Sequence, residues 1–384
     1  MVVPIIYEPY YSKDSIWCAG IRSGIEKALT RKKYFPVYID GDSYRSFDYD
    51  KLFKDTPRLL ILVANRCSWI LSALDFFEKN KIDILLVDCC PFINNSVKGQ
   101  VFFHYEHGIA TALEHLSKCG CSRTALYGLF RNSFADKMKQ RAFEEKMRCR
   151  GIDNVGSLCF DNDNGLADCY DKFHSRISEF DSVICTNEIA ANSLIKRLLA
   201  DGIRVPEQLQ IVSYGYTKLT DISNPSITTL KFDNCELGQQ IVMAFRYLYN
   251  SSPDTTHLTI RISGKLIQRG STRRQSDTAS VSMTRADSLD TVTLNFYDDE
   301  EVTAFSRIEK LLLACDDIDV KLLLGLLENM PYERISDGLH LSRSTVFYRI
   351  HRLEEAIDIT SLNDFKEFLI THHFKDILEN YIDD

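Results

Sequence analysis

Short apolar runs alternate with amphipathic stretches along the first part of the chain. Val2–Tyr7, Leu59–Ala64 and Ile82–Val87 are continuous apolar runs, as expected for strands that are buried on both faces. Between the runs, stretches such as Ile16–Lys32 and Ser68–Lys79 carry apolar residues at helical spacing. This alternation predicts an α/β fold with a parallel sheet and helices on both of its faces.

The same alternation recurs in a second segment. Val101–His104 is interpreted as a crossing into this segment, and the chain returns from Ile227–Lys231 through a predicted helix, Cys235–Tyr249. The pattern predicts two lobes joined by three crossings. Lobe one comprises residues 1–102 and 233–262, and lobe two comprises residues 104–230.

The stretch from Asp181 to Gly215 predicts a complete β-α-β unit. An apolar run precedes Thr186, Asn187 and Glu188, which are typical of a helix start, and a helical stripe and a second apolar run follow. Such units place ligands at the carboxyl ends of their strands. We therefore expect a binding site at residues 186–188 and in the loop 214–218.

Three segments in register resemble the lactose/galactose-repressor (LacI/GalR) family of sugar-sensing regulators. They are CTNEIAANSLIKRLLADGIRVPEQLQIVSYG within the unit above, NPSITTLKFDNCELGQQIV at Asn224–Val242 and ISGKLIQRGST at Ile262–Thr272. Two departures matter: Glu188 replaces the family's usual Asp, and Gly215-Tyr216 replaces its usual Asp-Asp. These departures argue against a plain hexose as the ligand.

The resemblance implies a two-lobed, periplasmic-binding-protein-like (type I) sensor over residues 1–272. It also implies a cleft that binds a small polar effector, sugar-like in character, because polar groups beside aromatic faces suit such a ligand. The effector-binding residues that it implies are Tyr10, Tyr11, Asn65, Arg66, Lys139, Asn187, Glu188 and Tyr216. The alternative is that these are ordinary loop residues and that the lobes serve as a dimerisation scaffold.

A different composition begins after the lobes. Ser271–Asp290 has almost no large apolar residues, which predicts a linker over residues 273–300, with a possible short strand at Thr291–Phe296. From about Val302 the chain is predicted to be helical to its end. Residues 301–384 thus form a predicted all-α domain.

Within this domain, residues 332–355 predict a helix-turn-helix. Pro331 suits the first position of a short helix that extends over Tyr332–Leu339, and His340-Leu341-Ser342 is the turn. The segment resembles the DNA-binding module of LuxR-type regulators and the terminal helix-turn-helix of PucR-type regulators. Hydroxyl, aromatic and basic side chains on the last helix suit a major groove. The predicted DNA-binding residues are Ser342, Arg343, Ser344, Thr345, Tyr348, Arg349 and Arg352.

The distribution of charge along the chain affects the predicted DNA binding of the helix-turn-helix. The chain of 384 residues carries a formal net charge of −8, and the excess of acidic residues falls after residue 315. Because phosphate neutralisation supplies non-specific DNA affinity, a single copy should bind DNA weakly. We therefore expect a homodimer that reads two half-sites. A tail that docks another protein, on a small-molecule or protein receptor that does not bind DNA, is the alternative.

Several other classes are not favoured by the sequence. No apolar run is long enough to span a membrane, and the first residues do not resemble a signal peptide. The twelve cysteines are scattered without metal-ligand spacing, as expected for reduced thiols in the cytoplasm. No nucleophile, phosphate-binding or dinucleotide-binding motif occurs, so we expect neither an enzyme nor a cofactor or metal.

Overall fold

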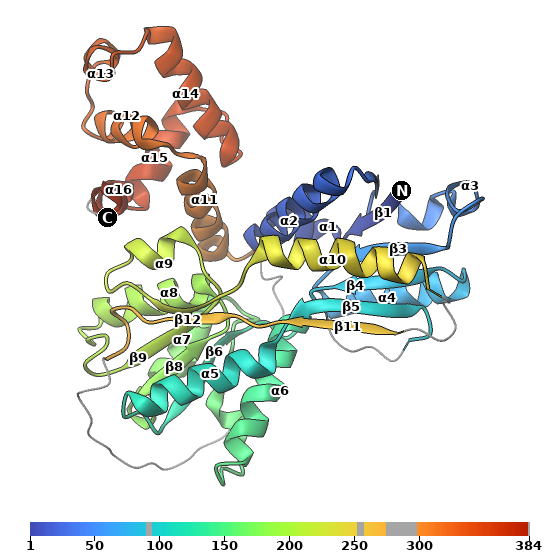
Figure 1. Ribbon diagram of the computed structural model, residues 1–384. Helices are drawn as coiled ribbons and strands as arrows, with labels where there is room; N and C mark the ends of the chain where they lie inside the picture. The colour runs from blue at the N-terminus through green and yellow to red at the C-terminus, as the bar shows by residue number, and fades with distance from the viewer. Residues whose placement is uncertain (90–93, 252–256, 274–297, 383–384) are drawn as a thin grey trace.

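Two six-stranded sheets, one in each lobe, form the framework of residues 1–273 (Figure 1). The computed structural model describes residues 1–89, 94–251, 257–273 and 298–382. Among these residues, no helix is long and apolar enough to cross a membrane.

The sheet of lobe one has the strand order β11-β5-β4-β3-β1-β2, and its strands pair in parallel. Helices α2 and α10 cover one face, where the close approach of Gly24 and Gly238 leaves no room for a side chain, and α4 covers the other. The elements are β1 (Val2–Tyr7), α1 (Pro9–Asp14), α2 (Ile16–Lys32), β2 (Phe35–Ile39), a 3-10 turn (Tyr44–Ser46), α3 (Tyr49–Leu52), β3 (Leu59–Val63), α4 (Cys67–Lys79), β4 (Asp83–Val87), β5 (Val97–Phe103), α10 (Asn234–Tyr249) and β11 (Leu258–Ile262).

The sheet of lobe two has the order β12-β10-β9-β8-β6-β7, in which only β12 runs antiparallel to its neighbour among the described strands. The elements are α5 (Tyr105–Lys118), β6 (Thr124–Leu129), α6 (Phe134–Arg148), a 3-10 turn (Val155–Leu158), β7 (Cys159–Asp161), α7 (Leu166–His174), a 3-10 turn (Ile177–Glu179), β8 (Ser182–Cys185), α8 (Glu188–Ala200), β9 (Gln210–Tyr214), α9 (Lys218–Ile222), β10 (Thr228–Lys231) and β12 (Lys265–Ile267).

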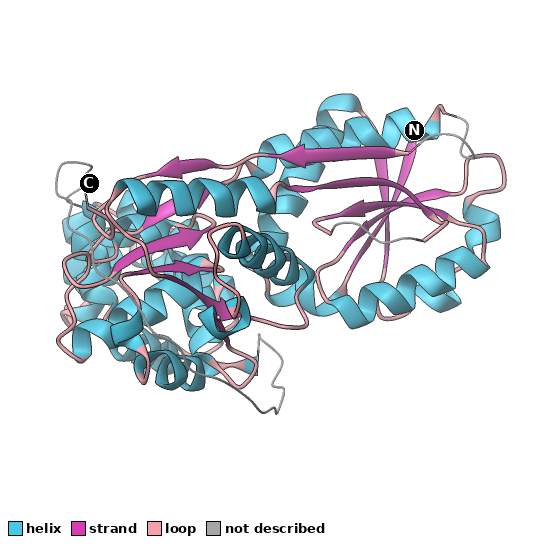
Figure 2. Ribbon diagram, turned by 90° about the horizontal axis from the view of Figure 1, so that it is seen from below, coloured by secondary structure: helices cyan, strands magenta, loops and turns pink. Residues whose placement is uncertain are grey.

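The chain passes between the lobes three times, as the hydrophobic pattern indicates. The passages are β5 to α5, β10 to α10, and β11 to β12. Figure 2 shows β11 and β12 following one another along the edges of both sheets. This last passage adds β12 to lobe two, beyond the segment that the sequence assigned to it.

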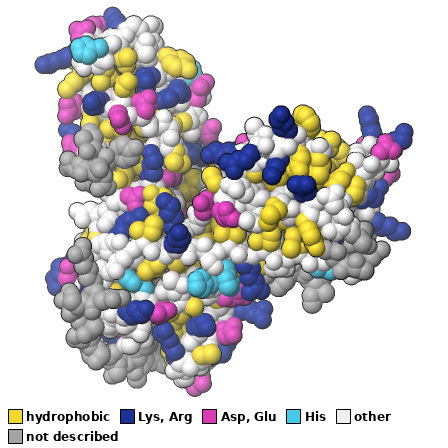
Figure 3. All heavy atoms as spheres, in the orientation of Figure 1, with side chains coloured by type: hydrophobic (Ala, Val, Ile, Leu, Met, Phe, Trp, Pro, Cys, Tyr) yellow, Lys and Arg dark blue, Asp and Glu magenta, His cyan; other side chains and the backbone are white. Residues whose placement is uncertain are grey.

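A helical domain follows, made of α11 (Glu300–Ala314), α12 (Asp317–Leu327), α13 (Tyr332–Leu339), α14 (Arg343–Ala356), α15 (Leu362–Thr371) and α16 (Phe374–Ile382). Its first helix, α11, lies against α8 and α9 of lobe two and also touches α2 of lobe one (Figure 1). Helix α16 also contacts α9. The remaining helices project away from the lobes, with a hollow between them and lobe one (Figure 3).

The structure corrects several predicted elements. Residues 9–14, expected in a loop, form the short helix α1, and the crossing expected at 101–104 is the end of a longer strand that begins at Val97. Helix α9 was not predicted, and Pro331 precedes α13 as its N-cap instead of occupying its first turn. The predicted strand at 291–296 and most of the predicted linker lie outside the described residues.

Candidate functional site

A cavity of about 120 Å³ lies between the lobes, at the carboxyl ends of strands from both sheets. Parallel strands of an α/β sheet bring their following loops to one edge, so residues that are distant in sequence meet there. Lobe one contributes Glu8, Tyr11, Trp17, Asn65, Arg66 and Asp88; lobe two contributes Phe130, Ser133, Ala135, Asp136, Lys139, Thr186, Asn187, Glu188, Tyr214, Gly215 and Tyr216; the crossings contribute Phe103, Tyr105, Phe232 and Asn234.

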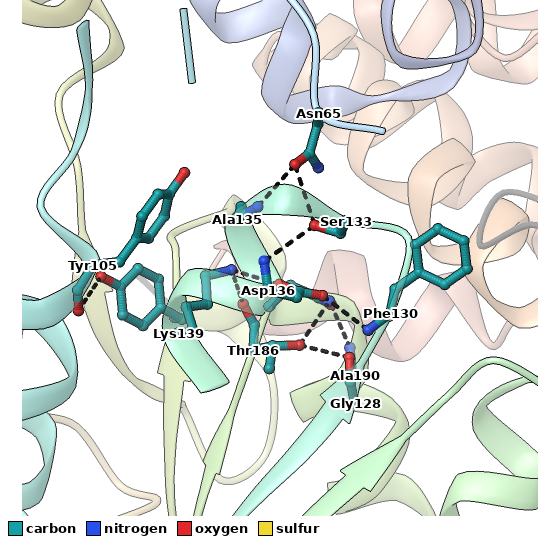
Figure 4. A network of polar contacts seen from close by, with 12 residues as sticks. Asn65, Tyr105, Gly128, Phe130, Ser133, Ala135, Asp136, Lys139, Thr186 and Ala190 are labelled. Atoms are coloured by element: carbon teal, nitrogen blue, oxygen red, sulfur yellow. Dashed lines mark hydrogen bonds and ion pairs between the residues drawn. The ribbon is translucent and has the colours of Figure 1, made fainter. Parts of the chain in front are cut away.

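The loop after β3 fastens one side of the cavity by bonding to the start of α6. The Asn65 side-chain oxygen accepts hydrogen bonds from Ser133 Oγ at 3.2 Å and from the Ala135 amide at 3.1 Å (Figure 4). The Phe134 amide also donates to the Asn65 carbonyl at 2.8 Å. Because Asn65 belongs to lobe one and α6 to lobe two, these bonds hold the lobes together beside the cavity.

A buried ion pair forms part of the wall in lobe two. Lys139 Nζ donates to Asp136 Oδ1 at 2.9 Å and to the Thr186 carbonyl at 2.7 Å (Figure 4). The ammonium also lies 4.8 Å from the centre of the Tyr214 ring. Lys139 and Asp136 are both more than nine-tenths buried, so each charge depends on the other for stabilisation.

A second ion pair lies in lobe one. Glu8 follows β1, and its Oε1 accepts a bond from Arg66 Nε at 2.6 Å. The other oxygen, Oε2, accepts bonds from the backbone amides of Asn65 and Arg66, each at 2.9 Å. Glu8 therefore fixes the loop after β3 and neutralises its arginine.

Asp88, directly after β4, is held by two tyrosines. Its carboxylate oxygens accept bonds from Tyr11 Oη at 2.6 Å and Tyr105 Oη at 2.7 Å. Burial raises the pKa of Asp88, and the two hydroxyl bonds partly offset this increase. Asp88 is thus a buried carboxyl group whose bonded partners are neutral.

Glu188 begins α8 and is almost completely buried in the cavity wall. Its Oε2 accepts a bond from the indole nitrogen of Trp17 at 2.9 Å, and its Oε1 has no hydrogen-bond partner among the described residues. The carboxylate lies against Gly215, where any side chain would collide with it. Burial raises the pKa of Glu188 to about 7.

The structure brings seven of the eight predicted effector-binding residues to this cavity: Tyr11, Asn65, Arg66, Lys139, Asn187, Glu188 and Tyr216. Tyr10 lies outside it. Because α1 is helical, the adjacent residues Tyr10 and Tyr11 point in different directions, and the Tyr10 ring is half exposed under the Arg66 guanidinium. The sequence analysis did not nominate Glu8, Trp17, Asp88 or Asp136.

In the helical domain, α13 and α14 are joined by the turn His340–Ser342. Ser342 caps α14, because its Oγ accepts a bond from the Thr345 amide at 3.1 Å. The predicted residues Ser342, Arg343, Ser344 and Tyr348 are exposed on α14, Tyr348 to 69%, and Thr345 is half-buried.

Arg349 and Arg352 both bond to the start of α12, with the Arg349 side chain 19% exposed and the Arg352 side chain 40% exposed. Arg349 forms ion pairs with Asp316 at 2.9 Å and with the fully buried Asp319 at 2.8 Å. Arg352 also pairs with Asp319 and bonds to the Ala314 carbonyl. Both arginines therefore hold α14 against the start of α12, contacts that the sequence analysis did not predict.

No group of His, Cys, Asp or Glu within the described part of the chain is arranged to hold a metal ion. His104 and Glu106 form a partly exposed pair at the start of α5. The lining of the cavity presents carboxylates, amides and aromatic rings to a ligand.

Comparison with known proteins agrees with this fold. Residues 113–272 match the family of periplasmic binding protein-like domains. The NTD biosynthesis operon regulator NtdR of Bacillus subtilis is 29% identical over 91 residues, 24% of this chain and 28% of that protein. The HTH-type transcriptional repressor PurR of Haemophilus influenzae is 23% identical over 193 residues, 49% of this chain and 56% of the repressor. The chain thus spans about half the length of PurR and less than a third of the length of NtdR.

Solved structures extend the likeness across both lobes. A transcriptional regulator CelR–cellobiose complex superposes with a TM-score of 0.60 and 15% identity, over 70% of this chain and 84% of that one. The Escherichia coli transcriptional repressor ascG superposes with a TM-score of 0.55 and 15% identity, over 71% of this chain and 98% of that one. These relatives are transcriptional regulators and not enzymes. The two lobes thus have the periplasmic-binding-protein-like fold of these solved regulators.

Proposed function

We propose that this chain is a cytoplasmic, DNA-binding transcriptional regulator. Its two lobes bind a small polar effector, and the bound effector controls a C-terminal helix-turn-helix. The observation that carries the proposal is the cavity between the lobes, which is lined from both sheets and connected to the helical domain. A ligand that contacts both lobes favours the arrangement in which they are closed, and this differential affinity is what regulation requires.

The proposed effector site comprises Tyr11, Asn65, Arg66, Lys139, Asn187, Glu188 and Tyr216. Lobe one supplies Tyr11, Asn65 and Arg66, and lobe two supplies Lys139, Asn187, Glu188 and Tyr216. An effector between them would add contacts to the bonds that already join Asn65 to α6. Binding of the effector would therefore change how tightly the two lobes are closed.

A continuous series of contacts leads from the cavity to the helical domain. Tyr216 in the cavity wall lies just before α9, and the N-terminal end of α9 is held by Glu309 of α11. Glu309 Oε1 accepts a bond from the Lys218 amide at 2.9 Å, and Oε2 accepts one from the Leu219 amide at 3.1 Å. A displacement of the loop at Tyr216 would therefore move α11.

Helices α13 and α14 are the proposed DNA reader. Arg343, Ser344 and Tyr348 are exposed on α14, with Ser342 and Thr345 at its capped start. These side chains offer donors for phosphates and base edges from the N-terminal part of a helix, the part that enters the major groove in helix-turn-helix proteins. Arg349 and Arg352 position this helix through Asp319.

The acidic composition of the tail supports a homodimer as the form that binds DNA. Two copies that occupy two half-sites add their phosphate contacts, which offsets the weak attraction of one acidic domain. The homodimer would also convert a change in lobe closure into a change in the spacing of two readers.

Selection of duplexes from a random DNA pool by the full-length protein tests the proposal. We expect enrichment of a two-fold symmetric sequence, and a binding constant that falls with salt. Arg343→Ala should reduce the salt slope by about one for each lost phosphate contact. Lys321→Ala, which removes an exposed charge on α12, is the matched control and should leave the selected sequence unchanged. If no sequence is enriched at low salt, a protein-docking tail replaces the DNA reader.

A further inference from the structure

The inter-lobe cavity contains more acidic than basic side chains. Its two basic groups each have an acidic partner: Arg66 pairs with Glu8 at 2.6 Å, and Lys139 pairs with Asp136 at 2.9 Å. Asp88 and Glu188 complete the charged lining, and each is held by neutral donors. An anionic ligand would therefore meet uncompensated negative charge and no available cation within the described lining.

Glu188 supplies a specific acceptor for a ligand. Trp17 donates to Oε2 at 2.9 Å, whereas Oε1 is buried without a hydrogen-bond partner among the described residues. A buried carboxylate oxygen that lacks a donor is costly, since neither water nor protein compensates for its lost hydration. A donor on a bound ligand would remove this cost, so we take Oε1 as the acceptor for a ligand N–H or O–H group.

Charge distinguishes an amine from a hydroxyl at this position. A hydroxyl group would satisfy the hydrogen bond of Oε1 and leave the buried negative charge unbalanced. An ammonium group satisfies both, and charge-assisted bonds of this kind are shorter and stronger than neutral ones. The ring of Trp17 also lines the cavity, and aromatic faces attract cations. The rings of Tyr214 and Tyr216 each already meet a lysine of the protein.

We propose that the effector is a small polyhydroxylated amine, such as an amino sugar or an aminocyclitol, whose ammonium group binds Glu188 Oε1. The proposal rests on the effector site proposed above and specifies the chemical class that this site selects. Asn65 and Asn187 lie on opposite lobes of the same cavity. Their side-chain oxygens already accept bonds from the Ala135 and Ala190 amides, so their amide N–H groups are the ones that would donate to the hydroxyl groups of such a ligand. The volume of about 120 Å³ limits it to a compact molecule.

Calorimetric titration of the full chain at pH 7 with matched probes tests the proposal. The probes are glucosamine, galactosamine, 2-deoxystreptamine and kanosamine, each compared with its hydroxyl counterpart and, for the sugars, with the N-acetylated form. We expect at least one amine to bind tenfold or more tightly than its neutral counterparts. Glu188→Gln should reduce this preference to within about twofold, because the glutamine keeps the shape and removes the charge. Glu207→Gln, at an exposed carboxylate of lobe two, should retain the preference.

Proton release gives a second readout that does not need a variant. The carboxyl group of Glu188, whose pKa of about 7 reflects burial and the nearby Glu309, opposed by Trp17 and Lys139, must ionise to bind an ammonium group. The affinity for the amine should therefore fall by up to about fivefold between pH 7 and pH 6, a range in which the ligand stays mostly protonated, with up to about one proton released per ligand at pH 6. A neutral polyol should show neither effect.

Three results would overturn the amine assignment: equal affinity for amine and hydroxyl counterparts, a preference that survives Glu188→Gln, or no binding by any amine of the panel. The proposed function fails separately, since it requires DNA selection by the full chain. Neutral sugars that bind and alter DNA affinity would refute the amine alone. Amines that bind a protein with no DNA affinity would refute the regulator alone.

Discussion

Trp17 of lobe one donates its indole N–H to Glu188 Oε2 of lobe two over 2.9 Å. The two residues are 171 positions apart in the sequence, and both line the cavity. Their bond therefore joins α2 of lobe one to α8 of lobe two at the cavity wall. It is a second connection between the lobes, in addition to the bonds that Asn65 makes with α6.

Replacement of Trp17 by Phe should weaken this closure. The variant leaves a buried carboxylate without its protein donor, so we expect the free energy of unfolding to fall by about 1–3 kcal/mol in urea titrations. Trp69→Phe is the control, because Trp69 makes an edge contact with Tyr44 inside lobe one and is not in the cavity lining. Equal losses in the two variants would mean that the inter-lobe bond adds nothing.

The stability of the protein should depend on pH through Glu188. Its pKa rises from an ordinary value of 4.5 to about 7 on folding because of burial. A carboxyl group with a raised pKa stabilises the folded state while it is protonated, and this stabilisation is lost as the pH rises from about 4.5 through 7. Glu188→Gln should therefore gain up to about 3 kcal/mol relative to the natural chain between pH 5 and pH 8. A constant difference between the two proteins across this range would contradict the assignment.

Replacement of Arg349 by Ala should lower the stability of the helical domain more than it removes a direct contact with DNA. Its removal leaves the fully buried Asp319 with one cationic partner fewer, and we expect a loss of about 2–3 kcal/mol in the unfolding of the helical domain. The exposed residue Tyr348 gives the opposite pattern: Tyr348→Ala should lower DNA affinity and leave the unfolding free energy within about 0.5 kcal/mol. Circular dichroism in urea, together with gel-shift assays, separates the two effects.

Glu309 should hold the helical domain to lobe two. Glu309→Ala leaves the amides of Lys218 and Leu219 without their acceptor, which we expect to cost about 1–3 kcal/mol and to loosen α11. A larger radius of gyration in small-angle scattering, and faster hydrogen exchange in α9, would report the loosening. Glu300→Ala, at an exposed position of the same helix, is the matched control and should change neither quantity.

The sequence predicts the strands of both lobes because they are continuous apolar runs, and this local property places the carboxyl ends where the site forms. Residues that follow a predicted strand, such as Asn65 and Glu188, could be nominated on that basis together with the family resemblance. Asp88 also follows a strand, and the same reasoning could have included it. Trp17 could not be found in this way, since it lies within α2 and reaches the cavity only through the packing of the two lobes.

Contacts between domains account for the remaining differences. Tyr10 and Tyr11 are equivalent candidates in a loop, and only the helical turn of α1 separates the exposed ring from the one bonded to Asp88. Arg352 looks available on a helical projection of α14 because the projection omits Asp319, which is supplied by a helix more than thirty residues earlier. Long-range partners of this kind leave no local trace in the sequence.

The docking of α11 has a consequence for the covalent structure of the chain. Val302 of α11 is buried in the core of lobe two, and Leu219 and Ile222 of lobe two are buried in the core of the helical domain. Each part thus completes the interior of the other, so the peptide linkage between them is dispensable for their association. Residues 1–273 and 298–384, produced as separate polypeptides in one cell, should assemble and purify as a stoichiometric complex.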